Sequence, residues 1–180
     1  MTATATPSET RSTRPAPDEY APYYGRYIEK VPDGDVVRTL REHRETTSAF
    51  LRGIPDAKGG HRYAPDKWSI REVVGHLSDC ERIFAYRALR FARADETLLP
   101  GFDENEFVKR ARLDERPMTS LIAELEAVRG ATVALFDGLF PDEWSRVGNA
   151  NGKAMSVRAL AWTIAGHELH HLGILRERYL

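Results

Sequence analysis

The sequence has a single cysteine, Cys80, among 180 residues, which excludes an intramolecular disulfide and suits a reducing compartment. Net charge is also nearly absent, because 27 acidic residues face 26 basic ones, so no global field would attract nucleic acid or an anionic membrane. No apolar run reaches the length of about 18 residues that a membrane-spanning helix needs. The N-terminus lacks the apolar core of a signal peptide. These absences predict a cytoplasmic protein that binds neither nucleic acid nor membrane.

Sustained strand-like alternation and internal repeats are missing as well, and the length suits one domain with a substantial core. Residues 1–17 carry almost no large apolar side chains, so we expect a flexible tail there. We expect one folded domain over residues 18–180. The aromatic-rich segment at residues 20–28 is predicted to pack across the core as a strap.

Apolar side chains recur at helical spacing in four long segments. The predicted helices cover residues 36–51, residues 70 to at least 91, residues 119 or 120 to 139, and residues 157 to the C-terminus. The clearest start signal is a capping box, in which Ser69 caps an amide three residues on and Glu72 reaches back. Four amphipathic helices predict an all-α four-helix bundle, with sites built from inward-facing side chains.

The last of these helices carries two histidines, His167 and His171, that interrupt its apolar face. Side chains four residues apart lie on the same face of a helix, one turn apart. Neutral imidazoles buried there need polar partners. A shared metal ion is one such partner, and a backbone carbonyl is the common alternative.

A third candidate ligand, His76, lies on a different helix, at the edge of a face that should point inward. If that helix packs beside the last one, His76 can meet the other two histidines. Three neutral imidazoles leave one coordination position open, which is typical of catalytic metal sites. Such a metal lowers the pKa of a bound water or thiol. Zinc, nickel and iron all suit three imidazoles.

The segment from His167 to His171 also satisfies the metalloprotease pattern H-E-x-x-H, with Glu168 as the general base. Only nine residues follow His171, and none is a histidine. This leaves no room for the rest of a protease domain, so we do not favour a peptidase. His170 lies about 60° around the helix from His167, and we expect it at the pocket flank or in solvent.

Two motifs together resemble the DinB-like superfamily: residues 68–77, and Gly166-His167 followed by His171. The positions of Asp79 and Glu81, and the loop at residues 102–104, are also similar to its members. The resemblance covers residues 20–180. It implies an up-down-down-up four-helix bundle, a divalent metal on His76, His167 and His171, and often a homodimer. It also implies relatives that are S-transferases using bacillithiol, mycothiol or glutathione, although a family name does not settle function.

We consider further residues around this site. Glu81 and Glu168 could each accept a hydrogen bond from a ligand's second ring nitrogen, or form a plain buried salt bridge. The remaining pocket candidates are Arg87, Arg90, Asp103, Asn105 and Asn151.

The leading hypothesis is a thiol-dependent S-transferase that acts on a small electrophile, with a low-molecular-weight thiol as co-substrate. The alternatives are a metal-dependent small-molecule hydrolase and a non-catalytic metal-binding or ligand-sensing dimer.

Overall fold

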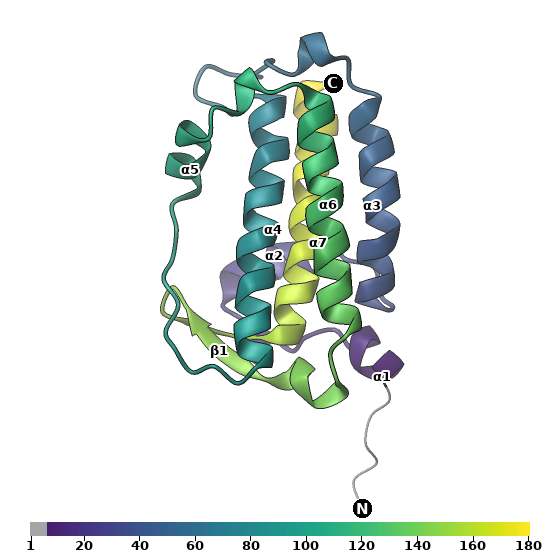
Figure 1. The fold of residues 1–180 in the computed structure, drawn as a ribbon, viewed down its shortest axis with the longest axis vertical. Coiled ribbons are helices and arrows are strands. Elements are labelled where there is room, and N and C mark those ends of the chain that lie inside the picture. Colours follow the sequence, from purple (N-terminus) through teal and green to yellow (C-terminus); the bar gives the residue numbers. More distant parts are fainter. Residues whose placement is uncertain (1–6) are drawn as a thin grey trace, which may run out of the picture.

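Four long helices form the protein, shown here as a computed structural model that describes residues 7–180. They are α3 (Val36–Arg52), α4 (Ile70–Ala92), α6 (Met118–Asp137) and α7 (Val157–Ile174). In Figure 1 the chain ascends in α3, descends in α4 and again in α6, and ascends in α7. Both α3 and α4 pack against α6 and α7. The predicted all-α, up-down-down-up bundle is confirmed.

Side-chain caps start three of the four long helices. The Ser69 hydroxyl accepts from the Glu72 amide, and the Glu72 carboxylate accepts from the Ser69 amide, so the capping box starts α4. Asp35 caps α3, and Ser156 caps α7. Such caps each contribute about 1 kcal/mol and satisfy amides that have no partner within the helix. α6 begins at Met118, slightly earlier than predicted.

Short elements connect the long helices and cover their sides. The aromatic segment forms η2 (Pro22–Tyr24) and α2 (Gly25–Ile28), and α2 packs against α7, as expected for a strap. The long connection from α4 to α6 contains α5 (Glu104–Arg110), which lies outside the bundle (Figure 1). The remaining turns are η1 (Pro17–Glu19), η3 (Asp56–Lys58), η4 (Leu113–Glu115), η5 (Pro141–Ser145) and the π-helical η6 (Leu175–Tyr179).

A small antiparallel hairpin, β1 (Val147–Ala150) and β2 (Lys153–Ser156), precedes α7 where we expected a plain connection. Its turn is Asn151-Gly152, with φ of 55° and 70°. Asn-Gly is the strongest short signal for such a turn, because both residues tolerate positive φ. Leu99, in the loop after α4, exchanges backbone hydrogen bonds with Asn149 and Asn151 and so fastens that loop to the hairpin.

Residues 7–17 differ from the flexible tail that we expected for residues 1–17. They contain α1 (Pro7–Ser12) and contact the bundle through arginines. Arg14 donates to the carbonyls of Ile28 and Val31 at 2.6 and 2.7 Å, and its guanidinium carbon lies 4.5 Å from the centre of the Trp162 ring. Hydrogen-bond donors thus anchor a segment that has little apolar surface. Residues 1–6 lie outside the described part.

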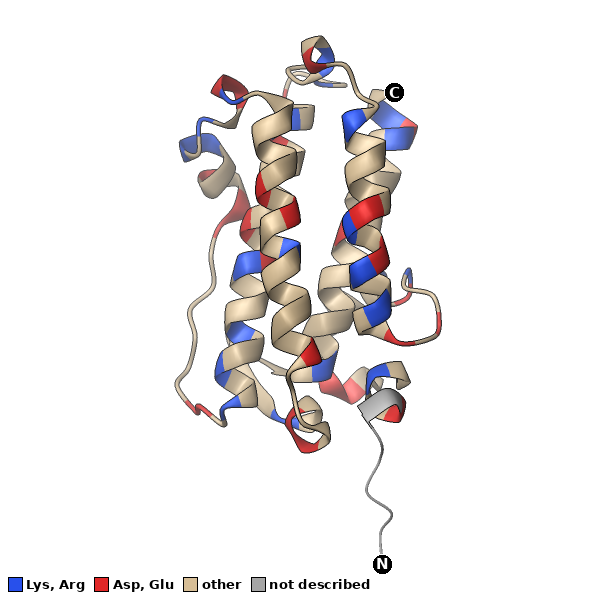
Figure 2. Ribbon diagram, turned by 45° about the vertical axis from the view of Figure 1, so that its right-hand side comes forward, with Lys and Arg blue, Asp and Glu red and all other residues tan. Residues whose placement is uncertain are grey.

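Two apolar clusters fill the bundle, one towards each end. One contains Phe84, Phe91 and Trp162, and the other contains Leu77, Leu121 and Leu172. A buried polar layer lies between them along the axis of α4 and α7. Acidic and basic residues are interspersed along the helices (Figure 2). Among residues 7–180, no helix is both long and apolar enough to cross a membrane.

Candidate metal centre

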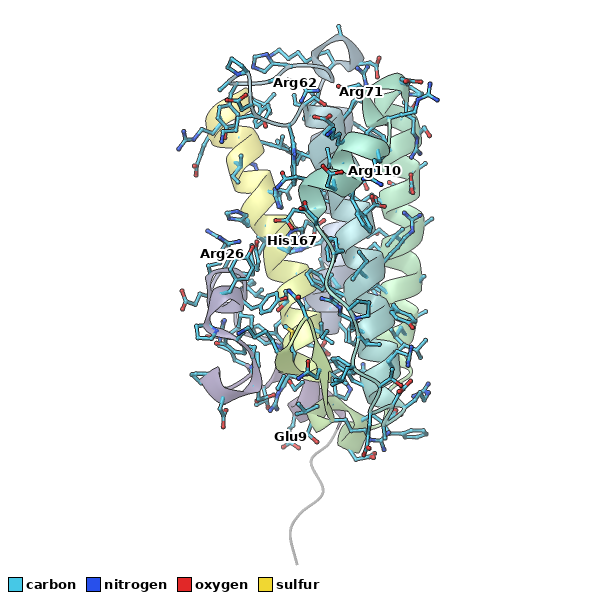
Figure 3. All side chains as sticks on the ribbon, turned by 90° about the vertical axis from the view of Figure 1, so that its left-hand side faces the viewer. Glu9, Arg26, Arg62, Arg71, Arg110 and His167 are labelled. Atoms are coloured by element: carbon cyan, nitrogen blue, oxygen red, sulfur yellow. The ribbon has the colours of Figure 1, made fainter. Side chains whose placement is uncertain are left out.

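Three histidine side chains converge in the polar layer between the two apolar clusters. His76 comes from the first half of α4, whereas His167 and His171 come from the second half of α7. The Nε2 atom of His167 lies 3.1 Å from Nε2 of His76 and 3.1 Å from Nε2 of His171. In Figure 3, His167 lies midway along the bundle. Antiparallel packing of α4 and α7 therefore joins ligand candidates that are far apart in the sequence.

The spacing of these nitrogens fits a shared divalent ion. Zinc–imidazole bonds are about 2.0–2.1 Å long, so two nitrogens on one ion lie roughly 3 Å apart. One donor atom from each histidine can be chosen so that all lie within 4.8 Å of one another. Aromatic rings hold the imidazoles from outside: Trp68 lies 4.5 Å from His76 and Tyr27 lies 5.2 Å from His167, centre to centre.

All three imidazoles are held in the neutral form that binds metal. Burial lowers the pKa of His76 to about 4. Burial, together with the neighbouring His76, lowers the pKa of His171 to about 3. The pKa of His167 falls well below its usual value, mainly through burial and then through the nearby histidines. No protons need to leave these rings at neutral pH before a metal binds.

A cavity of about 390 Å³ adjoins the three histidines. This volume is within the range of small-molecule sites, about 300–1,000 Å³. Its walls come from the strap, from α4, from the α4–α5 loop and from the hairpin. Besides the three histidines, the lining residues are Ala21, Tyr23, Tyr24, Arg26, Tyr27, Trp68, Cys80, Phe84, Arg87, Gly101, Phe102, Glu104, Asn151, Lys153 and His170.

Comparison with known proteins gives this centre a family context. The sequence model of the DinB superfamily matches residues 39–175. The chain belongs to the DinB superfamily. A candidate metal-dependent hydrolase of Oceanobacillus iheyensis is 27% identical over 157 residues, covering 82% of this chain and 87% of the relative. A second candidate metal-dependent hydrolase, from Geobacillus thermodenitrificans, is 23% identical over 137 residues, covering 75% of this chain and 77% of the relative.

The fold is also similar to a solved structure, that of YfiT from Bacillus subtilis, described as a candidate metal-dependent hydrolase with an unusual four-helix bundle topology. The match has a TM-score of 0.68 and covers 92% of this chain and 91% of YfiT, at 16% identity. That likeness concerns the fold alone. The metal-dependent relatives and the three-histidine cluster together support a divalent metal in this DinB-superfamily chain.

Gly166, which lies in the DinB-like motif of α7, allows the strap at residues 20–28 to approach the histidines. A Cβ atom there would lie 2.0 Å from the backbone oxygen of Tyr27, so α2 and α7 touch backbone to backbone. A similar approach occurs at Gly101, where a Cβ would lie 2.4 Å from the side-chain oxygen of Asn151. These contacts bring Tyr27 and Asn151 to the cavity wall.

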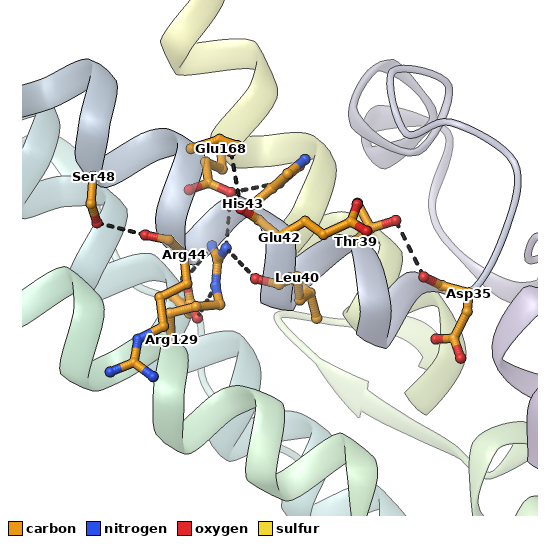
Figure 4. Close-up of polar contacts among 11 residues, drawn as sticks. Asp35, Thr39, Leu40, Glu42, His43, Arg44, Ser48, Arg129 and Glu168 are labelled. Carbon is orange, nitrogen blue, oxygen red and sulfur yellow. Dashed lines mark hydrogen bonds and ion pairs between the residues drawn. The ribbon is translucent and has the colours of Figure 1, made fainter.

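Glu81 and Glu168 bind an arginine that the sequence analysis missed. Arg129 of α6 donates two hydrogen bonds of 2.8 Å to Glu81 and one of 3.0 Å to Glu168. His43 donates from Nδ1 to Glu168 at 2.8 Å (Figure 4). Within the described chain, no hydrogen bond joins either carboxylate to His76, His167 or His171. The buried salt bridge is therefore the correct alternative for both glutamates.

The position of Arg129 in the sequence indicates that it is buried. Arg129 follows Leu125 by four residues, so it lies on the apolar stripe of α6. A buried arginine requires carboxylates, and Glu81 follows Leu77 by four residues on the buried face of α4. Burial would raise the pKa of Glu168, but Arg129 and His43 lower it to about 2. Glu168 is thus a structural anion, turned away from the cavity.

The other predicted pocket residues divide into two groups. Arg87 and Asn151 line the cavity. Arg90 does not, because three residues further along α4 it faces another side and pairs with an aspartate in the following loop. Asp103 caps α5 by accepting from backbone amides, and Asn105 borders a separate surface hollow. The pocket role predicted for these last three residues is therefore wrong.

Two cavity residues beside the histidines were not singled out as functional from the sequence. The Cys80 thiol lies 3.5 Å from Nδ1 of His76, one turn further along α4, and burial raises its pKa. Tyr27 packs edge-on against both His167 and His170. His170 therefore lies at the pocket flank, one of the two places expected for it.

Proposed function

We propose that the protein is a metal-dependent enzyme in which His76, His167 and His171 hold one divalent ion beside a small-molecule cavity. The observation that carries this proposal is the convergence of three Nε2 atoms at the wall of that cavity. Three protein ligands leave a position for a reactant. An ion held there would supply Lewis acidity and lower the pKa of a water or thiol.

The finer proposal is transfer of a low-molecular-weight thiol to a small electrophile. Glu168, the general base of the H-E-x-x-H pattern, is neutralised by Arg129 and does not line the cavity. Water attack normally needs such a base, whereas a thiol needs only to be held as its thiolate. In this transfer the thiol gives up its proton to solvent and its sulfur forms a bond to carbon. The electron pair of the broken bond leaves with chloride, or stays on the oxygen of an opened epoxide, which then takes up a proton. The rings of Tyr24, Phe84 and Phe102 offer an apolar wall for the electrophile.

Hydrolysis is the second candidate, supported by the names of the relatives and by Glu104. This half-buried residue is the cavity's carboxylate and could accept a proton from water. A third possibility, a metal-binding or ligand-sensing protein without turnover, shares the same centre.

We further propose zinc, nickel or iron as the ion, since imidazole suits each of them. We also propose a homodimer, as the family resemblance implies.

The first test asks whether the three histidines bind the metal ion. His76→Ala, His167→Ala and His171→Ala should each lose stoichiometric metal in elemental analysis, because two imidazoles hold an ion far less tightly than three. His170→Ala is the matched control and should keep its metal, since the ring lies on the cavity flank. Full metal retention in any of the three ligand variants would refute the assignment.

Turnover is tested next with the metal-loaded protein. Thiol consumption with a chlorinated aromatic or an epoxide supports transfer, whereas ester or amide cleavage without thiol supports hydrolysis. Neither activity across a broad panel, with one metal per chain, would favour the binding role.

A further inference from the structure

Two arginines are buried among the described side chains, and they differ in their partners. Arg129 binds two carboxylates, as described above. Arg87 is 5% exposed but forms no ion pair with any carboxylate of the described chain. It donates to the Pro100 carbonyl at 3.0 Å and lies beside the Tyr24 hydroxyl. A buried cation with only neutral partners is costly, so an anion from outside the chain would complete its environment.

Arg87 lies in the same cavity as the three histidines. It follows His76 by about three turns on one face of α4, and long helical side chains point back towards the helix start. Its guanidinium carbon lies 5.9 Å from the centre of the Phe84 ring, which itself lies 6.0 Å from the centre of the His167 ring. One phenyl ring therefore neighbours both groups, and a single small molecule can reach both.

The other charged residues around the cavity also favour binding of an anion. Arg26 and Lys153 line it as exposed cations, and neither forms an ion pair within residues 9–180. Glu104 is the one carboxylate among the lining residues. Three cations against one carboxylate give the cavity a positive potential, which attracts and retains small anions.

We propose that Arg87 is an anion-binding subsite, and that the molecule bound in this cavity carries a carboxylate at one end. The planar guanidinium binds a carboxylate through two parallel hydrogen bonds, which also orients the molecule. The rest of the molecule lies along Phe84 and Phe102 towards the histidines. As a statement about the substrate, this inference rests on the proposed function, but anion binding by the cavity can be measured without metal.

The probe is phenylacetate, with phenylacetamide as its uncharged counterpart, titrated calorimetrically into chelated full-length protein at low salt. Chelation ensures that the carboxylate cannot bind a metal ion instead. Wild type should bind phenylacetate more tightly than phenylacetamide. Arg87→Met should raise the phenylacetate dissociation constant roughly 10- to 100-fold, as expected when a hydrogen-bonded charge pair is lost.

Arg90→Met is the matched control, since it removes the same charge from the same helix outside the cavity. It should leave the dissociation constant near the wild-type value. Equal affinity for the two probes in wild type, or equal behaviour of the Arg87 and Arg90 variants, would overturn the proposal.

A structural role for Arg87 has a different signature. Removing a buried charge that has no counter-ion should leave the melting temperature of Arg87→Met equal to or above that of wild type. A marked drop would show that Arg87 stabilises the fold, and would count against the subsite. Elemental analysis of wild type before chelation separates the two proposals. Wild-type protein that carries stoichiometric metal but binds phenylacetate no more tightly than phenylacetamide contradicts only the anion-binding subsite. Absence of metal from wild type contradicts only the proposed metal centre.

Discussion

At the scale of single residues, Arg129 has the largest predicted effect on stability. Its guanidinium binds Glu81 in the middle of the bundle. It also binds Glu168 and the Leu40 carbonyl (Figure 4). Breaking a buried ion pair by removing one partner leaves an uncompensated charge and costs about 3–5 kcal/mol.

We therefore predict that Arg129→Met lowers the free energy of unfolding in urea by about 3–5 kcal/mol or prevents folding. Arg82→Met, which removes a half-exposed surface pair with Glu124, is the control and should cost about 1 kcal/mol or less. Similar losses in the two variants would contradict the assigned network.

Glu81→Gln tests whether Glu81 belongs to the salt-bridge network of Arg129 or supports a metal-binding histidine. Since Glu81 binds Arg129 and not a histidine, the variant should lose stability but keep its metal affinity in a competition titration. A partner that orients a ligand would instead change the affinity about 10–100-fold. Such a change would restore the interpretation that Glu81 supports a metal-binding histidine.

At the scale of elements, the strap is held against the bundle by a glycine contact. The α2 backbone at Tyr27 touches α7 at Gly166, with no space for a side chain between them. Overpacked contacts typically cost about 1–3 kcal/mol, and backbone atoms relax less readily than side chains. The edge-to-face contact of the Tyr27 ring with the His167 ring depends on this close packing of α2 against α7.

We predict that Gly166→Ala destabilises the protein by at least about 1–3 kcal/mol in thermal or urea unfolding. Gly173→Ala is the control in the same helix. A Cβ there would meet no atom within 4 Å, and alanine should be neutral or stabilising by about 0.5–1 kcal/mol. Equal effects of the two alanines would contradict the close α2–α7 contact.

At the scale of the whole molecule, the three histidines would connect α4 and α7 through a bound metal, while two apolar clusters hold the bundle independently. We predict that chelated protein keeps its helical circular dichroism at 25 °C and melts cooperatively at a lower temperature. A metal at a hundredfold excess over its dissociation constant adds about 2.7 kcal/mol, or roughly 5–10 °C in a chain of this size. Outright unfolding on chelation would make the histidines mainly a structural clamp.

The stability of the metal-free protein should also depend on pH. Unfolded histidines take up protons below about pH 6.5, whereas folded His76 does so only near pH 4. The unfolded state therefore binds more protons in this interval, and stability is lost as pH falls from 6.5 to 4. The contribution of His76 is at most about 1.4 kcal/mol per pH unit. Urea unfolding of wild type and His76→Gln between pH 7 and 4 should show a shallower slope in the variant.

The sequence by itself determined the features that depend on neighbouring residues. Helical periodicity placed the four long helices and the capping box at Ser69 placed the start of one of them, because these signals act within a few residues. The spacing of His167 and His171 likewise placed both rings on one face. Asn151-Gly152 encodes a hairpin turn just as locally, although the flanking strands are too short for their alternation to reveal them.

Only the tertiary structure decided which helical faces meet and at what depth along the bundle. Periodicity identifies an inward face but not the residue opposite it, so the meeting of His76 with His167 depended on the packing of α4 beside α7. The same limit hid the pairing of Arg129 with Glu81 and Glu168, and left Arg87 and Arg90 equally plausible as pocket residues. Packing turned Arg87 into the cavity and Arg90 away from it, because three helical positions change the direction of a side chain by about 60°.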